Sequence, residues 1–295
     1  MGITGNCAKF LLYSKKLGVD FSNTLMLGRQ QLFISSLERT ELQSAFNGFL
    51  QWPDNGGFAE PLFKALGAQA IQSMDYSDFE KATLIHNLNE RVPRHQLNNY
   101  SVVFDGGTLE HVFNFPIAIK NCMDMIKVGG HFVAITPTNN YSGHGFYQFS
   151  PELFFTLFTP SHGFNLKMVA MGVEFPSTGI TEWFKVKDPM RVGQRVTITN
   201  AYPTSLMIIA EKVRETETLQ LQPFQSDYQH IWSVHHSINN DVKLEGEKKW
   251  VHQYRRWMPE FIKKIIRNIR GIPDKQSYVN ELGVVNPLFF TKMDV

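Results

Sequence analysis

The chain has 295 residues, which is enough for one large α/β domain with additions or for a domain with a small appendage. Hydrophobic residues make up 43% of the sequence and charged residues 19%, as is typical of a globular protein with a buried core. The formal net charge of +2 provides no general attraction to nucleic acid, so we expect no nucleic-acid partner. No apolar run approaches the roughly 20 residues of a membrane-spanning helix, so we expect no transmembrane segment.

The cysteines and histidines indicate neither a disulfide framework nor a metal centre. Cys7 and Cys122 lie far apart in the sequence, and the 10 histidines are scattered. His235 and His236 are neighbours that cannot both reach one ion from a regular helix. The first residues also lack the basic start and long apolar stretch of a secretory signal. The simplest interpretation is a reduced, cytoplasmic protein without a metal site.

Short apolar runs alternate with segments of helical pattern from the start of the chain to about residue 212. A helix is expected at 8–17, others around Leu37 to Phe46 and at 60–66, and two more begin at Asn114 and Ser150. Alternation of this kind predicts a parallel or mostly parallel sheet, whose strands form continuous apolar runs when both faces are covered. The seven expected strands are 23–27, 70–74, 82–86, 101–104, 132–135, 166–173 and 206–210.

Three local signals predict where two of the helices begin and end. Asn114 is expected to cap a helix that carries Pro116 in its first turn, and Gly129-Gly130 is expected to end that helix. Ser150-Pro151-Glu152 opens the next helix by the same logic.

The last third of the chain differs in pattern. An insertion at about 175–204 is partly strand-like at 195–199, and a helical tail is expected at about 235–270. We therefore predict an α/β domain at 1–212 and a mainly helical extension at 213–295 packed on it. Residues 257–270 form an amphipathic basic helix, which either packs on the domain with a solvated face or contacts a membrane surface or an acidic partner.

Reactive residue types gather after two of the expected strands. Asp105-Gly106-Gly107 ends one strand and is followed by Glu110 and His111, of which we expect at most one to face a substrate, because neighbours point in different directions. The loop after the next strand places His144 between two glycines. This loop is either an ordered structural loop or a substrate-binding loop. Its candidate substrate-binding residues are Asn139, Asn140, Tyr141, Tyr147 and Gln148.

Two of these stretches together resemble a known family. Asp105-Gly106-Gly107-Thr108-Leu109-Glu110-His111-Val112 and Lys127-Val128-Gly129-Gly130-His131-Phe132 are similar to motifs of the class I S-adenosylmethionine-dependent methyltransferases, in particular the small-molecule group. The resemblance covers roughly residues 20 to 212. It implies a doubly wound, Rossmann-like sheet of seven mostly parallel strands with helices on both faces, S-adenosyl-L-methionine as the cofactor, and a small-molecule substrate.

The resemblance also implies a cofactor site. Asp75 stands where the family often has an acid for the ribose, and Asn87 stands near the place of the adenine contact. The first loop, Leu27-Gly28-Arg29-Gln30-Gln31, has one glycine where the family normally has three, so Arg29 or Gln30 would fill space that is usually empty. The alternatives are a plain turn at Gly28, a solvated turn residue or helix cap at Asp75, and an Asx turn at Asn87. The implied cofactor-binding residues are Gly28, Arg29, Asp75, Asn87, Asp105, Gly106 and Gly107.

The expected activity is methyl transfer to a small hydroxylated acceptor, such as a sugar or glycan precursor. A hydroxyl acceptor needs a base, and we expect His144 in this role because an unperturbed histidine titrates near pH 6.5, with Glu110 and His111 as reserves. The alternative is a methyltransferase-like fold that has lost the cofactor and serves as a scaffold or binding protein. A nicotinamide-dependent oxidoreductase is disfavoured, because no Gly-x-Gly-x-x-Gly turn follows the first strand.

Overall fold

The computed structural model describes residues 2–45, 57–175, 178–193, 195–216, 223–226, 228 and 288–294. The chain divides into two compact units, of which the first comprises Met1–Val186, Tyr202–Pro223 and Thr291–Val295. The second comprises Lys187–Ala201 and Phe224–Phe290, and its described helix is α6 (Pro189–Val192). The predicted helical tail at 235–270 lies outside the described residues, and the predicted boundary at 212 stays a prediction.

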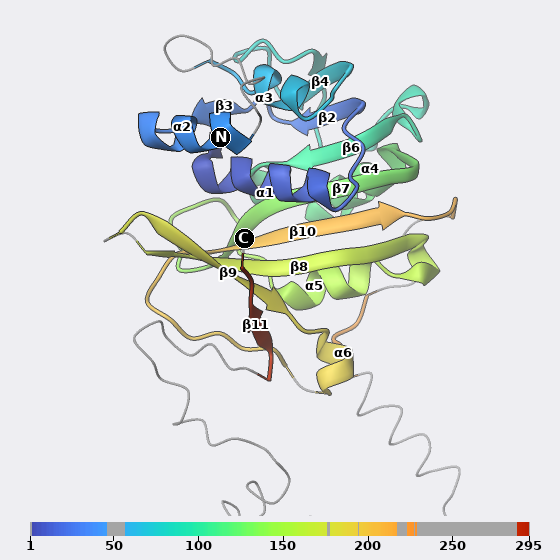
Figure 1. Ribbon diagram of the computed structural model, residues 1–295. Helices are drawn as coiled ribbons and strands as arrows, with labels where there is room; N and C mark the ends of the chain where they lie inside the picture. The colour runs from blue at the N-terminus through green and yellow to red at the C-terminus, as the bar shows by residue number, and fades with distance from the viewer. Residues whose placement is uncertain are drawn as a thin grey trace, which may run out of the picture. The chain divides into compact units, whose positions relative to one another are not determined.

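The first unit is built on a mixed sheet, which has nine strands in the described part of the chain, in the order β11-β9-β8-β10-β7-β6-β2-β4-β5 (Figure 1). All seven predicted strands are present in it, and β9 and β11 extend one edge. A separate two-stranded sheet pairs β1 (Gly2–Thr4) with β3 (Gln31–Phe33). The strands of the large sheet are β2 (Asn23–Leu27), β4 (Ala70–Asp75), β5 (Leu84–Ile85), β6 (Tyr100–Asp105), β7 (Ile126–Asn139), β8 (Phe164–Phe175), β9 (Ile180–Val186), β10 (Thr204–Lys212) and β11 (Phe290–Lys292).

The order of the strands creates a switch point between β2 and β6. From β2 the chain runs outward to β4 and β5, and it then returns to the other side of β2 to form β6 and β7. These five strands pair in parallel, whereas β10 is antiparallel to both β7 and β8. In open α/β sheets, ligands bind beyond the carboxyl ends of the strands at such a switch point. We therefore expect a ligand site near the residues that follow β2, β4 and β6.

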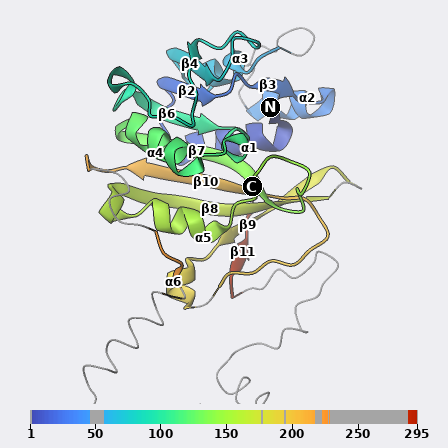
Figure 2. The ribbon, with the colours of Figure 1, turned by 180° about the vertical axis from the view of Figure 1, so that it is seen from behind.

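Helices cover both faces of this sheet. α1 lies in front of it in Figure 1, and α4 and α5 lie in front of it in the reverse view of Figure 2. On the first face, Val102 and Phe104 of β6 share a buried cluster with Phe10 and Phe63. On the other face, the ring of Phe132 stacks on that of Phe158, just after α5. The helices of this unit are α1 (Gly5–Lys16), α2 (Ser36–Ala45), α3 (Glu60–Ala65), α4 (Phe115–Met125) and α5 (Pro151–Leu157), with short 3-10 turns η1 (Arg94–Gln96), η2 (Leu109–His111) and η3 (Pro160–His162).

Of the three predicted helix boundaries, the two starts are confirmed in position and the one end is wrong. Ser150 caps α5 by accepting a hydrogen bond from the amide of Glu152. Asn114 occupies the N-cap position of α4 and Pro116 lies in its first turn, but the Asn114 side chain makes no cap hydrogen bond. Gly129 and Gly130 lie inside β7 and do not end α4, which stops at Met125. A Cβ on Gly130 would lie 2.8 Å from the carbonyl oxygen of Tyr100, so this glycine permits the close approach of β7 to β6.

The insertion after β8 also differs from its prediction. The strand predicted at 195–199 is absent, and the insertion instead forms β9, which pairs antiparallel with β8. The reason is burial, because Trp183 and Phe184 of β9 are both buried. Each described helix is too short or too polar to span a bilayer.

Candidate functional site

Gly28, Asp75 and Gly106 lie at one level along the carboxyl edge of the sheet. In the strand register Leu27 stands opposite both Met74 and Asp105, so the next residue of each strand shares this level. Gly28 turns the chain with a φ of +67°, and its amide donates a 2.7 Å hydrogen bond to Met74 O. The structure thus brings together three of the predicted cofactor residues.

The loop after β2 runs into β3 and not directly into a helix. The side chain of Arg29 is held by its neighbours, because its Nε is 2.8 Å from Glu60 Oε1 and its guanidinium lies over the Phe58 ring at 3.8 Å. Gln30 is fully buried, and its Nε2 donates to Leu27 O at 2.6 Å. Its Oε1 lies 3.0 Å from the position of a Cβ on Gly106 and accepts no hydrogen bond within the described residues. Gln30 therefore fills space beside Gly106 at the switch point.

The side chains of Asp75 and Asn87 have local partners. Asp75 Oδ1 accepts a 2.6 Å hydrogen bond from the amide of Tyr76. Asn87 Oδ1 accepts one from the amide of Asn89 at 3.1 Å, which is the pattern of an Asx turn. This local bond at Asn87 matches the structural alternative for that residue. Beside Asp75, the side chains of Tyr76 and Phe79 are exposed.

Asp105 organises the loop that leads from β6 to η2. Its Oδ1 accepts hydrogen bonds from the amides of Thr108 at 2.8 Å and Leu109 at 3.3 Å. Burial, followed by the nearby Glu110 carboxyl, raises the pKa of Asp105. Thr108, which sequence reasoning missed, donates from Oγ1 to Leu27 O at 2.7 Å and ties this loop to the end of β2. The loop after β6 is therefore attached to the end of β2, at the switch point of the sheet.

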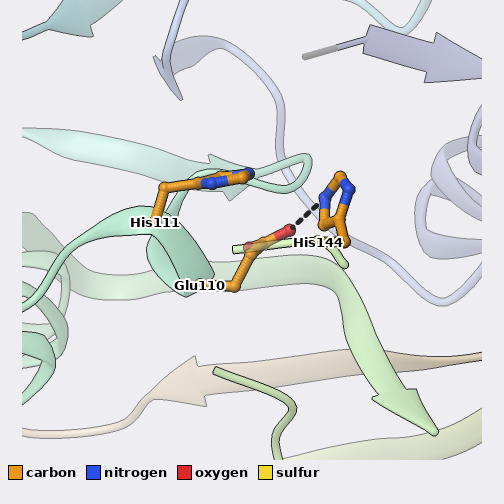
Figure 3. Close-up of side chains that lie close together, drawn as sticks. All are labelled: Glu110, His111 and His144. Carbon is orange, nitrogen blue, oxygen red and sulfur yellow. Dashed lines mark ion pairs between the residues drawn. The ribbon is translucent and has the colours of Figure 1, made fainter. Parts of the chain in front are cut away.

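Glu110, His111 and His144 converge just beyond that loop (Figure 3). Glu110 is only 1% exposed, and its Oε1 lies 3.3 Å from His144 Nε2. The rings of His111 and His144 meet edge-on with centroids 5.0 Å apart. Both Glu110 and His111 lie near His144, which comes from a distant segment of the chain, and the expectation that at most one of the two faces a substrate stays a prediction.

Burial shifts two of these groups in opposite directions. Desolvation raises the pKa of the Glu110 carboxyl. Desolvation, followed by the neighbouring His144, lowers the pKa of His111. Burial therefore raises the pKa of Glu110 to about 7 and lowers that of His111, so it disfavours the charged form of both groups.

The loop that carries His144 is docked on the backbone of Glu110. The amides of Phe146 and Tyr147 donate to Glu110 O at 2.8 and 3.2 Å. Gly145 has a φ of +70°, and a Cβ there would lie 2.9 Å from the same oxygen. Glycine at this position thus allows the loop to approach Glu110 closely.

Most of the predicted substrate-binding side chains hold this loop in place. Asn139 ends β7. Asn140 Nδ2 donates to Tyr202 O at 2.7 Å, and Gln148 Oε1 accepts from the amide of Tyr141 at 2.9 Å. The hydroxyls of Tyr141 and Tyr147 donate to Glu174 Oε1 at 2.7 Å and to Phe113 O at 2.6 Å. Their contacts fit an ordered structural loop that positions His144.

Two exposed aromatic rings lie beside this cluster and were not predicted from the sequence as site residues. Phe113 is 73% exposed and Phe146 68% exposed, and their rings meet edge-on with centroids 6.0 Å apart. Phe146 also donates its amide to Glu110 O, which places this pair next to the polar cluster. The sequence signal was the clustering of phenylalanine around Asn114 and Tyr147.

No family model and no curated protein sequence matches the chain. Among solved structures, it is similar to a protein from Bacillus halodurans provisionally described as a methyltransferase, at 8% identity, a TM-score of 0.40, and coverage of 69% of this chain and 99% of that one. A Burkholderia thailandensis 1,6-didemethyltoxoflavin-N1-methyltransferase, solved with S-adenosylhomocysteine, matches at 12% identity and a TM-score of 0.39 over 71% of this chain and 78% of that one. A Thermotoga maritima S-adenosylmethionine-dependent methyltransferase matches at 12% identity and a TM-score of 0.40 over 70% and 89%.

All three proteins are described as methyltransferases, which is the activity that the sequence motifs imply. The similarity to them is weak, so a functional assignment depends on the strand order and the site of this chain.

Proposed function

We propose that this protein is an S-adenosylmethionine-dependent methyltransferase that acts on a small hydroxylated acceptor. The observation that carries the proposal is the contact between the loop after β6, which contains Gly107, and the cluster formed by Glu110 and His144. A Cβ on Gly107 would lie 3.1 Å from Glu110 Oε1, and that oxygen is 3.3 Å from His144 Nε2. A proton-accepting pair therefore packs against the loop where a doubly wound sheet holds its ligand.

The residues at the sheet edge fit the cofactor, although not through a glycine-rich loop. Asp75 uses Oδ1 for Tyr76, which leaves Oδ2 to accept a hydrogen bond from a ribose hydroxyl. The exposed ring of Tyr76 offers an apolar face for the adenine. Gln30 Oε1 is a buried acceptor without a donor in the described structure, and the ammonium of the methionine portion would supply one. We do not assign Arg29 and Asn87 to the cofactor, because their side chains are engaged elsewhere.

The cofactor supplies a methyl group that its sulfonium already activates. The chain then has to orient the acceptor, exclude water and remove the hydroxyl proton. His144 Nε2 faces Glu110, so Nδ1 is the atom left to take that proton. The carboxylate of Glu110, whose Oε1 is 3.3 Å from His144 Nε2, would stabilise the imidazolium that forms.

The acceptor that best fits the surroundings has an aromatic or other apolar body. The amide and hydroxyl groups of the His144 loop already bond within the protein, so they do not favour a sugar. Phe113 and Phe146 instead expose an apolar surface next to Glu110 and His144. We therefore propose a phenolic hydroxyl in place of the predicted sugar or glycan precursor.

Calorimetric titration with S-adenosylhomocysteine tests cofactor binding. We expect measurable heat with the wild-type chain and affinity at least about tenfold weaker for Asp75→Ala, because one charged hydrogen bond contributes about 1.5–3 kcal/mol. Asp78→Ala, which removes an exposed carboxylate in the same loop, is the matched control and should bind like wild type. Absence of heat at millimolar ligand would contradict the proposal and favour the scaffold alternative.

Transfer of labelled methyl groups to a panel of phenols tests the base. His144→Ala should lower turnover by about 10²–10⁴-fold, the usual contribution of a general base, while S-adenosylhomocysteine still binds with unchanged affinity. His95→Ala removes an exposed histidine outside the cluster and should retain full turnover. Full turnover in the His144 variant would refute the base assignment.

A further inference from the structure

Glu110, His111 and His144 form a group whose ligand atoms all lie within 4.8 Å of one another. Glu110 and His111 come from η2, and His144 comes from the loop after β7, 33 positions further along the chain. Two imidazoles and one carboxylate are a ligand set that divalent transition metals use in proteins, zinc and iron among them. Figure 3 shows both rings and the carboxylate approaching a common space.

Burial and backbone contacts hold the carboxylate of this group in place. Glu110 Oε1 is buried, faces His144 Nε2, and accepts no hydrogen bond in the described structure. Its Oε2 accepts a hydrogen bond from Thr136 Oγ1 at 3.4 Å, and this bond orients the carboxylate. The Glu110 carbonyl binds the amides of Phe146 and Tyr147, so the segment that carries His144 is fixed to the segment that carries the other two ligands.

The separations suit a shared ion. Atoms that bind one zinc ion at about 2.0–2.2 Å lie about 3–3.5 Å apart, and the 3.3 Å between Glu110 Oε1 and His144 Nε2 agrees with this spacing. His111 and His144 are exposed, so small rotations of their rings can close the remaining separations. Their exposure also leaves the side of the ion opposite Glu110 open to water or to a ligand.

We propose that Glu110, His111 and His144 bind one divalent transition metal ion, with zinc as the best match to the ligand set, through three protein ligands and an open position. Binding of the ion is independent of the proposed methyl transfer. The catalytic consequence rests on that proposed function: a hydroxyl bound at the open position would lose its proton to solvent because of the positive charge of the ion, and His144 would be a ligand in place of the base.

Calorimetric titration of the metal-stripped 295-residue chain with zinc chloride tests this proposal. We expect the wild-type chain to bind one zinc equivalent more than the His111→Ala/His144→Ala double variant, since histidines elsewhere in the chain bind zinc equally in both. Glu110→Gln should weaken this extra site by at least tenfold. His95→Ala, which removes an exposed histidine outside the group, should keep the site.

Cobalt(II) supplies a second readout that does not depend on activity. The wild-type chain should develop visible absorption bands with one added cobalt equivalent, and the double variant should not. Because both substituted histidines are exposed, the variant should keep the wild-type far-ultraviolet circular dichroism. Equal zinc stoichiometry and affinity in the wild-type chain and the double variant would overturn the proposal. That result would leave the cofactor titration unaffected, so the two proposals fail separately.

Discussion

Lys212 lies at the end of β10 with 2% of its surface exposed. Its Nζ donates to Asn98 Oδ1 at 2.6 Å and to Ile126 O at 2.9 Å, so one ammonium joins the end of β10 to the start of β7 and to the loop before β6. Burial lowers the pKa of this lysine. A buried cation with two protein acceptors is costly to remove, because both acceptors would lose their partner.

The lowered pKa predicts a pH-dependent contribution to stability. Between the folded-state pKa of Lys212 and the ordinary lysine value of about 10.4, the unfolded chain binds the proton more tightly, so the free energy of unfolding rises with pH in that window. Lys212→Met removes this contribution. Urea denaturation from about pH 8 to about pH 10 should therefore show the wild type gaining stability relative to the Lys212 variant.

Lys185→Met is the control for that experiment, because Lys185 is an exposed lysine of β9. Its unfolding free energy should parallel that of the wild type across the same pH range. Parallel curves for the wild type and Lys212→Met would show that burial does not shift the lysine in the folded protein.

At the scale of an element, the loop after β7 is docked by backbone contacts. Asn140 and Gly145 both have positive φ angles, and the amides of Phe146 and Tyr147 donate to Glu110 O. The sequence indicated an unusual loop through its glycines and polar residues, but the contact with Glu110 joins residues 36 and 37 positions apart. Local patterns do not encode such a pairing, because it depends on the parallel placement of β6 and β7.

Gly145→Ala should detach this loop. Its φ of +70° and the 2.9 Å approach of a Cβ to Glu110 O predict a loss of about 1–3 kcal/mol in the free energy of unfolding. Hydrogen exchange at the amides of Phe146 and Tyr147 should accelerate, because these amides lose their acceptor. Denaturation and exchange measurements check the two effects.

Gly143→Ala is the matched control from the same loop. A Cβ at Gly143 would meet no heavy atom within 4 Å, so the variant should stay within about 0.5 kcal/mol of the wild type. If both glycine variants behaved alike, the docking of the loop through Gly145 would be refuted.

Across the whole first unit, Trp183 connects the extended edge of the sheet to the beginning of the chain. Its Nε1 donates to Asn6 Oδ1 at 2.7 Å, and its ring packs edge-on against Phe10 and Tyr13 of α1. The strand that carries it, β9, belongs to the insertion, for which the sequence predicted a strand in the wrong place. The insertion therefore contributes to the core of the unit.

Trp183→Ala should lower the free energy of unfolding by about 3–5 kcal/mol, as expected for loss of a buried aromatic side chain. Trp183→Phe keeps a ring against Phe10 and loses the bond to Asn6, so it should cost about 1 kcal/mol. Equilibrium denaturation of both variants measures the difference. Similar losses in the two variants would mean that ring packing contributes little.

The sequence by itself determined the features that depend on neighbours along the chain. Continuous apolar runs indicated seven strands, Ser150-Pro151 indicated the start of α5, and the polar stretches after β6 and β7 indicated where reactive side chains gather. Each signal is local, because strand burial, helix capping and turn formation depend on residues a few positions apart.

Only the tertiary structure decided which distant residues meet. It placed Gln30 beside Gly106, joined Trp183 to α1, and brought Glu110, His111 and His144 to one point. These contacts follow from strand order and register, which arise when the whole sheet packs against its helices. The chemistry of the site therefore depends on a convergence that no single stretch of the sequence contains.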